Sequence, residues 1–366
     1  MKNLNILIKP SSNKCNLQCK YCFYDDVSHS REISDYDYMT ADTAIAIIDN
    51  VFSTEGLESV HFGFQGGEPT LSGIEFFTNF FNHVNEVKGN VQVDFSLQTN
   101  GILIDENWTK LFKENDVLVG LSLDGPAKFH DNNRIDFGNK HTHSKVMAAA
   151  KLMHSEGVAF NVLTVVTSKN AVNIEKIYDY LVKNDFTYLQ FIPVLEPLDY
   201  KVSNIRKVND QYYEYLSNLY KAWIKDYKTG KYISVRFFNN MLNIMLGGSP
   251  EACDMRGVCS VQNIIEADGT TFTCDFYAID KYKIGNAATD KFVDMMSTEI
   301  AKDFVMSSTK HPEECKNCEV YALCRNGCRR MRSNGKYMYC DALKKFLRTY
   351  GKELNQVAIE LSMRNR

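Results

Sequence analysis

Short apolar runs and helix-like stretches alternate along the first two hundred residues of the chain. Each apolar run has the length of a buried strand and ends at proline, glycine or polar residues. We therefore expect six strands, at residues 4–9, 59–64, 91–97, 117–123, 158–166 and 187–192. Helices are expected between them, after an N-cap at Thr40 and near residues 73–87, 105–114, 143–156 and 171–184.

Strand–helix alternation of this kind implies a parallel sheet with right-handed crossovers. We predict an α/β fold built as a partial (β/α) barrel of six strands. In such barrels the chemistry lies at the C-terminal ends of the strands. The polar and glycine-rich turns of this chain fall at that end, namely a cysteine-rich loop after the first strand and the sequences QGGEP, QTNG and SLDGP.

The pattern changes after residue 199. Residues 208–227 form an aromatic-rich helical stretch, and a second helix near 237–246 precedes two glycines. Eight cysteines follow from residue 253 onward. We predict three parts: a partial barrel over 1–199, a helical bridge over 200–250, and a cysteine-rich domain with a C-terminal helix over 251–366.

Composition narrows the class of protein. The chain has 366 residues, 44% of them hydrophobic and 24% charged, with a net charge of −3. These values are ordinary for a globular protein and argue against nucleic acid as the main partner. No apolar run is long enough for a signal peptide or a membrane span, so we expect a cytoplasmic protein without a membrane partner. Because thiols stay reduced in the cytoplasm, the eleven clustered cysteines favour metal or cluster ligation over disulfides.

The sequence KCNLQCKYCFY, residues 14–24, holds Cys15, Cys19 and Cys22 in one short loop. Three thiolates can bind one metal group and leave one coordination position open. In an iron–sulfur cube they would bind three irons and leave the fourth free for another ligand. A structural zinc loop, or three unrelated thiols, is the alternative.

The eight later cysteines are enough for two further cubes of four ligands each. They are Cys253, Cys259, Cys274, Cys315, Cys318, Cys324, Cys328 and Cys340. Asp268–Gly269 is a hairpin signal that would bring Cys259 and Cys274 together. Two structural zinc sites are the alternative, and spacing alone does not pair the ligands.

The CxxxCxxC spacing of the first three cysteines resembles the radical S-adenosylmethionine (radical SAM) superfamily, and the later cysteines resemble its SPASM extension. The resemblance implies that the open iron binds the amino and carboxylate groups of S-adenosylmethionine, whose cleavage gives a 5′-deoxyadenosyl radical. Gly66, Gly67 and Glu68 resemble the superfamily's GGEP element, which implies contact with the methionine end. Further cofactor contacts implied by the resemblance are Ser122, Arg134, Tyr21 and Leu195. Gln98 and Asp124 lie at strand ends and are as consistent with turn caps as with ligands.

Longer strings resemble the anaerobic sulfatase-maturating enzymes. They include LIKPSSNKCNLQCKYCFY, FQGGEPTL, VGLSLDGP and CDFYAIDKYKIGN. The resemblance implies that a cysteine or serine in a Cys/Ser-x-Pro/Ala-x-Arg segment of a sulfatase is oxidised to formylglycine. It implies Asp275 as the base that takes the substrate proton, a neighbouring cluster as electron acceptor, and an external electron donor such as flavodoxin or ferredoxin.

The same resemblance implies three [4Fe–4S] clusters. The first is on the loop cysteines, and the two auxiliary clusters divide the later ones. The nearer auxiliary cluster would be held by Cys253, Cys259, Cys274 and Cys328, and the outer one by Cys315, Cys318, Cys324 and Cys340.

Two other functions fit part of the pattern. A radical SAM/SPASM maturase that crosslinks or otherwise modifies a ribosomal peptide shares the cysteines, but such enzymes often carry an N-terminal peptide-recognition domain. A first strand that begins near residue 4 leaves no space for that domain. A non-catalytic zinc-ribbon module is the alternative from a different class, and metal content distinguishes it from both enzymes.

Overall fold

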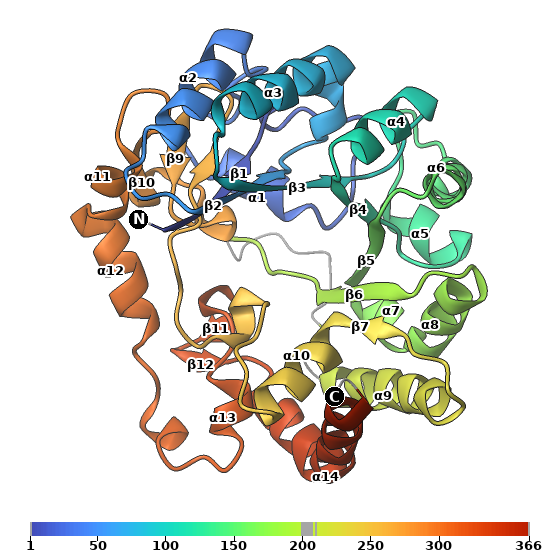
Figure 1. Cartoon of the computed structure of the whole chain (residues 1–366). Helices are drawn as coiled ribbons and strands as arrows, with labels where there is room; N and C mark the ends of the chain where they lie inside the picture. The colour runs from blue at the N-terminus through green and yellow to red at the C-terminus, as the bar shows by residue number, and fades with distance from the viewer. Residues whose placement is uncertain (1, 199–207, 209–210, 365–366) are drawn as a thin grey trace.

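The computed structural model describes residues 2–198, 208 and 211–364. Its main sheet contains the six expected strands as parallel neighbours in chain order. These strands are β1 (Asn3–Ile8), β2 (Ser59–Phe64), β3 (Gln92–Thr99), β4 (Leu118–Ser122), β5 (Phe160–Val166) and β6 (Tyr188–Pro193). Figure 1 shows them as an open arc with helices on its outer side. The predicted partial (β/α) barrel is therefore confirmed.

Helices occupy the connections between these strands, as the sequence pattern predicts. They are α2 (Ala41–Phe52), α3 (Gly73–Val87), α4 (Glu106–Glu114), α6 (His143–Glu156) and α8 (Ile174–Lys183). Thr40 caps α2, because its Oγ1 accepts a hydrogen bond from the Thr43 N–H at 3.1 Å. Apolar side chains join helices to sheet: the buried rings of Phe64 and Phe77 meet edge to face with centroids 5.0 Å apart.

Three short helices in the strand–helix connections were not predicted. They are α1 (Phe23–His29), α5 (Ala127–Asn133) and α7 (Ser168–Ala171). At seven, seven and four residues they are too short for an apolar repeat to stand out in the sequence. All three lie at the C-terminal end of the strands, where α1 directly follows the cysteine loop.

Two longer helices follow the barrel, as the aromatic-rich sequence predicts. They are α9 (Tyr212–Lys228) and α10 (Arg236–Met245), with the two-residue strand β7 (Ser234–Val235) between them. The strand β7 pairs in parallel with β6 and so extends the sheet. The last helix, α14 (Cys340–Arg364), packs on α9, where the rings of Tyr220 and Tyr350 are 4.7 Å apart. The expected boundary at residues 199 and 200 lies outside the described residues.

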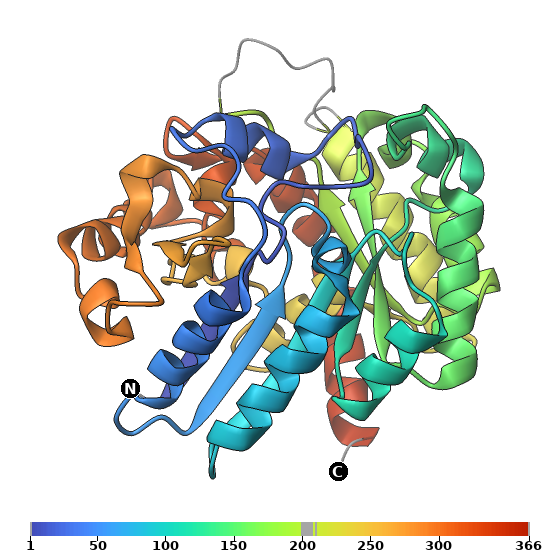
Figure 2. The same ribbon diagram turned by 90° about the horizontal axis from the view of Figure 1, so that it is seen from above.

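The cysteine-rich segment also joins the main sheet. The strands β8 (Ile264–Ile265), β9 (Thr270–Phe272) and β10 (Lys283–Asn286) give a ten-stranded sheet in which β8 is parallel to β1. The expected hairpin is present: β8 and β9 are antiparallel and Gly269 has φ +89° at the turn. In Figures 1 and 2 this segment, coloured orange, lies along the β1 edge. The predicted division at residue 250 stays a prediction.

The rest of the cysteine-rich segment is made of short elements. They are α11 (Phe292–Met296), α12 (Glu299–Ser308), α13 (Tyr321–Cys324), β11 (Arg332–Ser333) and β12 (Lys336–Tyr337). None of the eleven cysteines, all of which lie in the described part of the chain, is in a disulfide. None of the helices within the described residues combines the length and the apolar character that a bilayer crossing requires.

Candidate active site

A cavity of about 470 Å³ lies at the C-terminal ends of the barrel strands. Its size is within the range of roughly 300–1,000 Å³ that is usual for small-molecule sites. Every residue that the sequence suggested as a cofactor contact lines it, together with Asp275. These contacts are Tyr21, Gly66, Gly67, Glu68, Ser122, Arg134 and Leu195. The barrel loops therefore bring together residues that are far apart in the sequence.

The three loop cysteines line the same cavity, and each thiol accepts a hydrogen bond. The Leu17 N–H donates to Cys15 Sγ at 3.4 Å, and the Asp25 N–H donates to Cys22 Sγ at 3.4 Å, which makes Cys22 the N-cap of α1. Burial raises the pKa of Cys15 to about 12. A buried thiolate therefore needs a positively charged partner beyond these hydrogen bonds, which is what a metal group supplies.

The turn after β2, which contains Gly66 and Gly67, packs closely against the cysteine loop. A Cβ on Gly67 would lie 2.0 Å from the Lys14 carbonyl oxygen, so that position excludes every other residue. Gly66 has φ +121°, and the Gly67 N–H donates to the Ser12 carbonyl at 2.7 Å. The two glycines thus bring the turn into contact with the loop that carries the thiols, in addition to opening a wall of the cavity.

Glu68 connects the loops after β2 and β3. Its side chain is buried, and its Oε1 accepts from the Thr70 N–H, the Thr70 hydroxyl and the Thr99 hydroxyl. Its Oε2 accepts from the Asn100 N–H at 2.8 Å. Burial raises the pKa of this carboxyl, and the four hydrogen bonds oppose that change. Glu68 therefore already organises two loops of the site, whatever contact it makes with a ligand.

Arg134 and Tyr21 share one carboxylate, that of Asp124. The Arg134 Nε is 3.4 Å from Asp124 Oδ2, and the Tyr21 hydroxyl donates to the same oxygen. The Arg134 Nη1 also donates to Cys19 Sγ at 3.9 Å. Asp124, which the sequence left without a role, thus orients the cation beside the cysteine loop, while its other oxygen accepts from the Val165 N–H at 3.0 Å.

The buried side chain of His130 connects the backbone of Asp124 to that of Arg134 through hydrogen bonds. The Asp124 N–H donates to His130 Nδ1 at 3.3 Å, so the ring proton is on Nε2, which donates to the Thr142 hydroxyl at 3.1 Å. That hydroxyl donates in turn to the Arg134 carbonyl at 2.7 Å. Burial, with Arg134 and His143 nearby, lowers the pKa of His130 to about 2.

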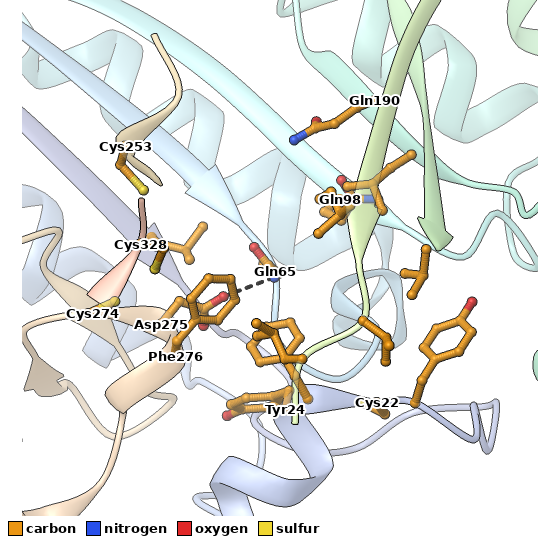
Figure 3. A pocket seen from close by; sticks show the side chains of 18 of the residues that line it. Cys22, Tyr24, Gln65, Gln98, Gln190, Cys253, Cys274, Asp275, Phe276 and Cys328 are labelled. Atoms are coloured by element: carbon orange, nitrogen blue, oxygen red, sulfur yellow. Dashed lines mark hydrogen bonds between the residues drawn. The ribbon is translucent and has the colours of Figure 1, made fainter. Parts of the chain in front are cut away.

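Asp275 lies across the cavity in the cysteine-rich segment, directly after Cys274 and at the start of the 3₁₀ helix η4 (Asp275–Tyr277). Its Oδ1 accepts from the Lys9 ammonium at 2.5 Å and its Oδ2 from the Gln65 side-chain amide at 3.1 Å. Figure 3 shows Asp275 and Gln65 together, with Cys22 on the opposite side of the pocket from Cys274. The carboxylate has two partners from the barrel, at the ends of β1 and β2.

A second pair of buried charges lies beside this one. The Arg31 guanidinium and the Glu266 carboxylate are 2.8 Å apart, and both side chains are fully buried. The Tyr24 hydroxyl donates to Glu266 at 2.7 Å, and the Lys9 ammonium is 3.4 Å from the centre of the Tyr24 ring. Sequence reasoning missed Lys9, Arg31 and Glu266. The available signal was a lysine that directly follows an apolar strand, but its partner is more than 260 positions away in the chain.

The eight later cysteines form two spatial sets. The pKa of Cys328 is raised to about 12, mainly by burial and in part by the nearby Cys253 and Cys259. Those three and Cys274 line the cavity. The pKa of Cys324 is raised to about 11, mainly by burial and in part by the nearby Cys340, Cys315 and Cys318, and these four do not line the cavity. In the described part of the chain, no three acidic, histidine or cysteine side chains are close enough for a single metal ion. The assignment of each set to a cluster stays a prediction.

Comparisons with known proteins identify the family. A model of the radical SAM superfamily matches residues 10–181, and a model of the SPASM iron–sulfur cluster-binding domain matches residues 253–319. A cysteine-type anaerobic sulfatase-maturating enzyme of Clostridium novyi is 41% identical over 100% of both chains. This chain belongs to the anaerobic sulfatase-maturating enzymes. The family resemblance noted in the sequence, and the expectation of a radical SAM enzyme, are confirmed.

Other sulfatase-maturating relatives show the same relationship. The cysteine-type enzyme of Clostridium perfringens is 39% identical over 94% of this chain and 96% of its own. The serine-type enzyme of Bacteroides thetaiotaomicron is 28% identical over 89% and 83%. Among solved structures, native anSMEcpe with bound AdoMet and Cp18Cys peptide has a TM-score of 0.93 at 38% identity and covers 98% of this chain and 99% of its own.

The residues present fit the groups that this family uses. Three thiols with hydrogen-bond donors lie beside a cavity that also contains a buried guanidinium, which suits an open iron–sulfur cube and a cofactor that carries a carboxylate. The second set of thiols at the cavity, beside Asp275, has the donor chemistry that a further iron–sulfur cluster would need.

We expect His130 to make the site sensitive to acid. Its folded-state pKa lies below the unfolded value of about 6.5, so its contribution to stability is complete above pH 6.5 and is lost as pH falls toward 2. The loss of stability is at most about 1.4 kcal/mol per pH unit.

The unfolding midpoints of the wild type and His130→Gln should be compared anaerobically at pH 7.5 and 5.5. The fall in midpoint between the two pH values should be smaller in the variant. His154→Gln, on an exposed face, is the control and should keep the wild-type shift. Equal shifts in wild type and His130→Gln would contradict this role.

Proposed function

We propose that this enzyme oxidises a peptidyl cysteine of a sulfatase to formylglycine, within a Cys-x-Pro/Ala-x-Arg segment, with serine as the poorer substrate. One observation carries the proposal: the loop cysteines and Arg134 line one side of a cavity whose other side presents Asp275 and Cys274. The preference for cysteine is supported by identities of 39–41% to cysteine-type relatives against 26–28% to serine-type ones.

The cofactors that we propose are S-adenosylmethionine and three [4Fe–4S] clusters, reduced by a donor such as flavodoxin or ferredoxin. The loop cysteines would hold one cluster, and the two spatial sets of later cysteines would hold the others. When bound, these groups supply the one-electron chemistry, namely removal of a hydrogen atom from the substrate Cβ and uptake of the remaining electron.

The protein side chains bind and orient the reactants. Arg134, held by Asp124, offers a cation to the cofactor carboxylate, and Ser122, whose hydroxyl accepts from Gln98 at 3.1 Å, is a partner for the ribose. Tyr21 and Leu195 add apolar surface that excludes water. Glu68 and the two glycines keep the loops of the barrel together around this space.

Asp275 is the proposed proton acceptor. Once the substrate Cβ has lost a hydrogen atom, loss of one electron and of the thiol proton leaves a thioaldehyde, and water replaces the sulfur to give the aldehyde and hydrogen sulfide. The carboxylate is at the cavity wall with Oδ2 on the Gln65 side, where it can take that proton directly or through one water.

Metal analysis tests the cofactor content. The anaerobically reconstituted protein should contain about twelve irons per chain, from three four-iron cubes. Replacing Cys15, Cys19 and Cys22 together by alanine should leave about eight irons per chain, because the two sets of later cysteines, which would hold the other two cubes, are unchanged. Stoichiometric zinc without iron would exclude the radical mechanism.

A sulfatase-derived peptide tests the reaction. A peptide with the Cys-x-Pro-x-Arg segment should lose about 18 Da when incubated with reconstituted enzyme, S-adenosylmethionine and reductant, and its serine counterpart about 2 Da, by the atoms exchanged. A peptide with alanine at the reactive position is the control. Cofactor cleavage without any mass change in either peptide would favour a maturase of ribosomal peptides instead.

Asp275→Asn tests the proposed base. Product formation should fall by roughly 10²-fold or more, because a positioned proton acceptor typically contributes that much. Iron content and formation of 5′-deoxyadenosine should remain. Asp275 Oδ1 binds Lys9 and Oδ2 binds Gln65, so neither oxygen is needed as a cluster ligand. Loss of about four irons from this variant would show that Asp275 is a cluster ligand instead.

A further inference from the structure

Lys9 carries a charge in the interior of the protein. It directly follows β1, and its side chain has no exposed surface. Fully buried lysines are rare, because removal of the ammonium from water is costly unless a partner offsets it. Here the partner is Asp275 Oδ1 at 2.5 Å, and the face of the Tyr24 ring lies on another side of the ammonium. Two hydrophobic side chains at these positions would stabilise the junction at least as much as the ion pair does. Stability alone therefore does not explain why a charged residue is buried here.

The Asp275 carboxylate is held at both oxygens. Lys9 binds Oδ1 from the end of β1. Gln65 binds Oδ2 from the loop after β2, as the dashed line in Figure 3 shows. Asp275 itself belongs to the cysteine-rich segment and directly follows Cys274. The orientation of its carboxylate therefore depends on side chains from the barrel, on the opposite side of the junction.

We propose that Lys9 is a positioning residue that fixes the Asp275 carboxylate with Oδ2 at the cavity wall. The inference rests on the proposed role of Asp275. Lys9 does not line the cavity, so it acts through the Asp275 carboxylate that it binds. Orientation matters because a misplacement of about 1 Å can cost roughly 10²-fold in rate. Without the ammonium, the hydrogen bond that the Asp275 carboxylate keeps within the described residues is the longer one from Gln65.

Arg31 provides a matched control. It is also a buried cation of the barrel that pairs with a carboxylate of the cysteine-rich segment, but its partner is Glu266 at 2.8 Å. Removing either cation leaves one buried carboxylate unpaired, and both variants should lower the thermal unfolding midpoint. Only the loss of Lys9 disturbs Asp275 directly, so general destabilisation and loss of positioning can be separated.

A double-mutant cycle tests the proposal. Lys9→Met is introduced into the wild type and into Asp275→Asn, and formylglycine is measured per 5′-deoxyadenosine, together with peptide KM, iron content and unfolding midpoint. With Asp275 present, Lys9→Met should lower the ratio at least tenfold, while KM and iron content change by less than about twofold. In the Asp275→Asn background, the same substitution should change the ratio by less than about twofold. Arg31→Met should lower the midpoint and leave the ratio unchanged.

Other outcomes would overturn the proposal. An equal effect of Lys9→Met in both backgrounds would mean that Lys9 serves stability alone. If Asp275→Asn lowers the product ratio and Lys9→Met does not, the inference fails while the role of Asp275 stands. If Asp275→Asn itself has wild-type turnover, both fail, but the sulfatase-peptide reaction is unaffected. Should Lys9→Met not fold, Lys9→Gln takes its place in the same cycle. Its side chain is one atom shorter than lysine and carries no charge, so the ratio should again fall with Asp275 present and stay unchanged in Asp275→Asn.

Discussion

The junction between the cysteine-rich segment and the barrel depends on charged side chains that are buried there. Two cations from the barrel, Lys9 and Arg31, pair with two carboxylates from the other segment, Asp275 and Glu266. The charges balance, which is what makes their burial tolerable. Removing one member of either pair would leave the other charge buried without its partner, at a cost of about 3–5 kcal/mol. The relative position of the two segments is therefore strongly specified.

Backbone pairing adds to this constraint. The strand β8 continues the barrel sheet beside β1, where the Lys9 N–H donates to the Ile265 carbonyl at 2.8 Å and the Leu7 N–H to the Asn263 carbonyl at 3.1 Å. The cavity is consequently formed by two parts of the chain that share one sheet. One part presents the loop thiols and the guanidinium of Arg134, and the other presents Asp275 beside a second set of thiols. The residues proposed for radical generation and those proposed for the later oxidation thus line one cavity.

Much of the barrel could be read from the sequence because its signals are local. The strand at residues 59–64 and the helices at 73–87 and 143–156 have the expected bounds, since apolar periodicity and flanking turns are properties of neighbouring residues. Thr40 and the Asp268–Gly269 turn were predicted for the same reason. The helix α1 and the strand β7 were missed, because a helix of seven residues makes only about two turns and a strand of two residues shows no alternation. Their formation depends on partners elsewhere in the chain.

The sequence alone determined the family, the barrel and the type of side chain that would ligate the clusters. Cysteine spacing and strand–helix alternation are patterns among residues that are close together in the chain. The tertiary structure decided how those donors are used. It joined the cysteine-rich segment to the barrel sheet, gave Arg134 its partner Asp124, and divided the later thiols into two sets. It also paired Lys9 with Asp275 across 266 positions. Pairings of this kind follow from burial and charge balance in the folded state, and no local pattern of residues encodes them.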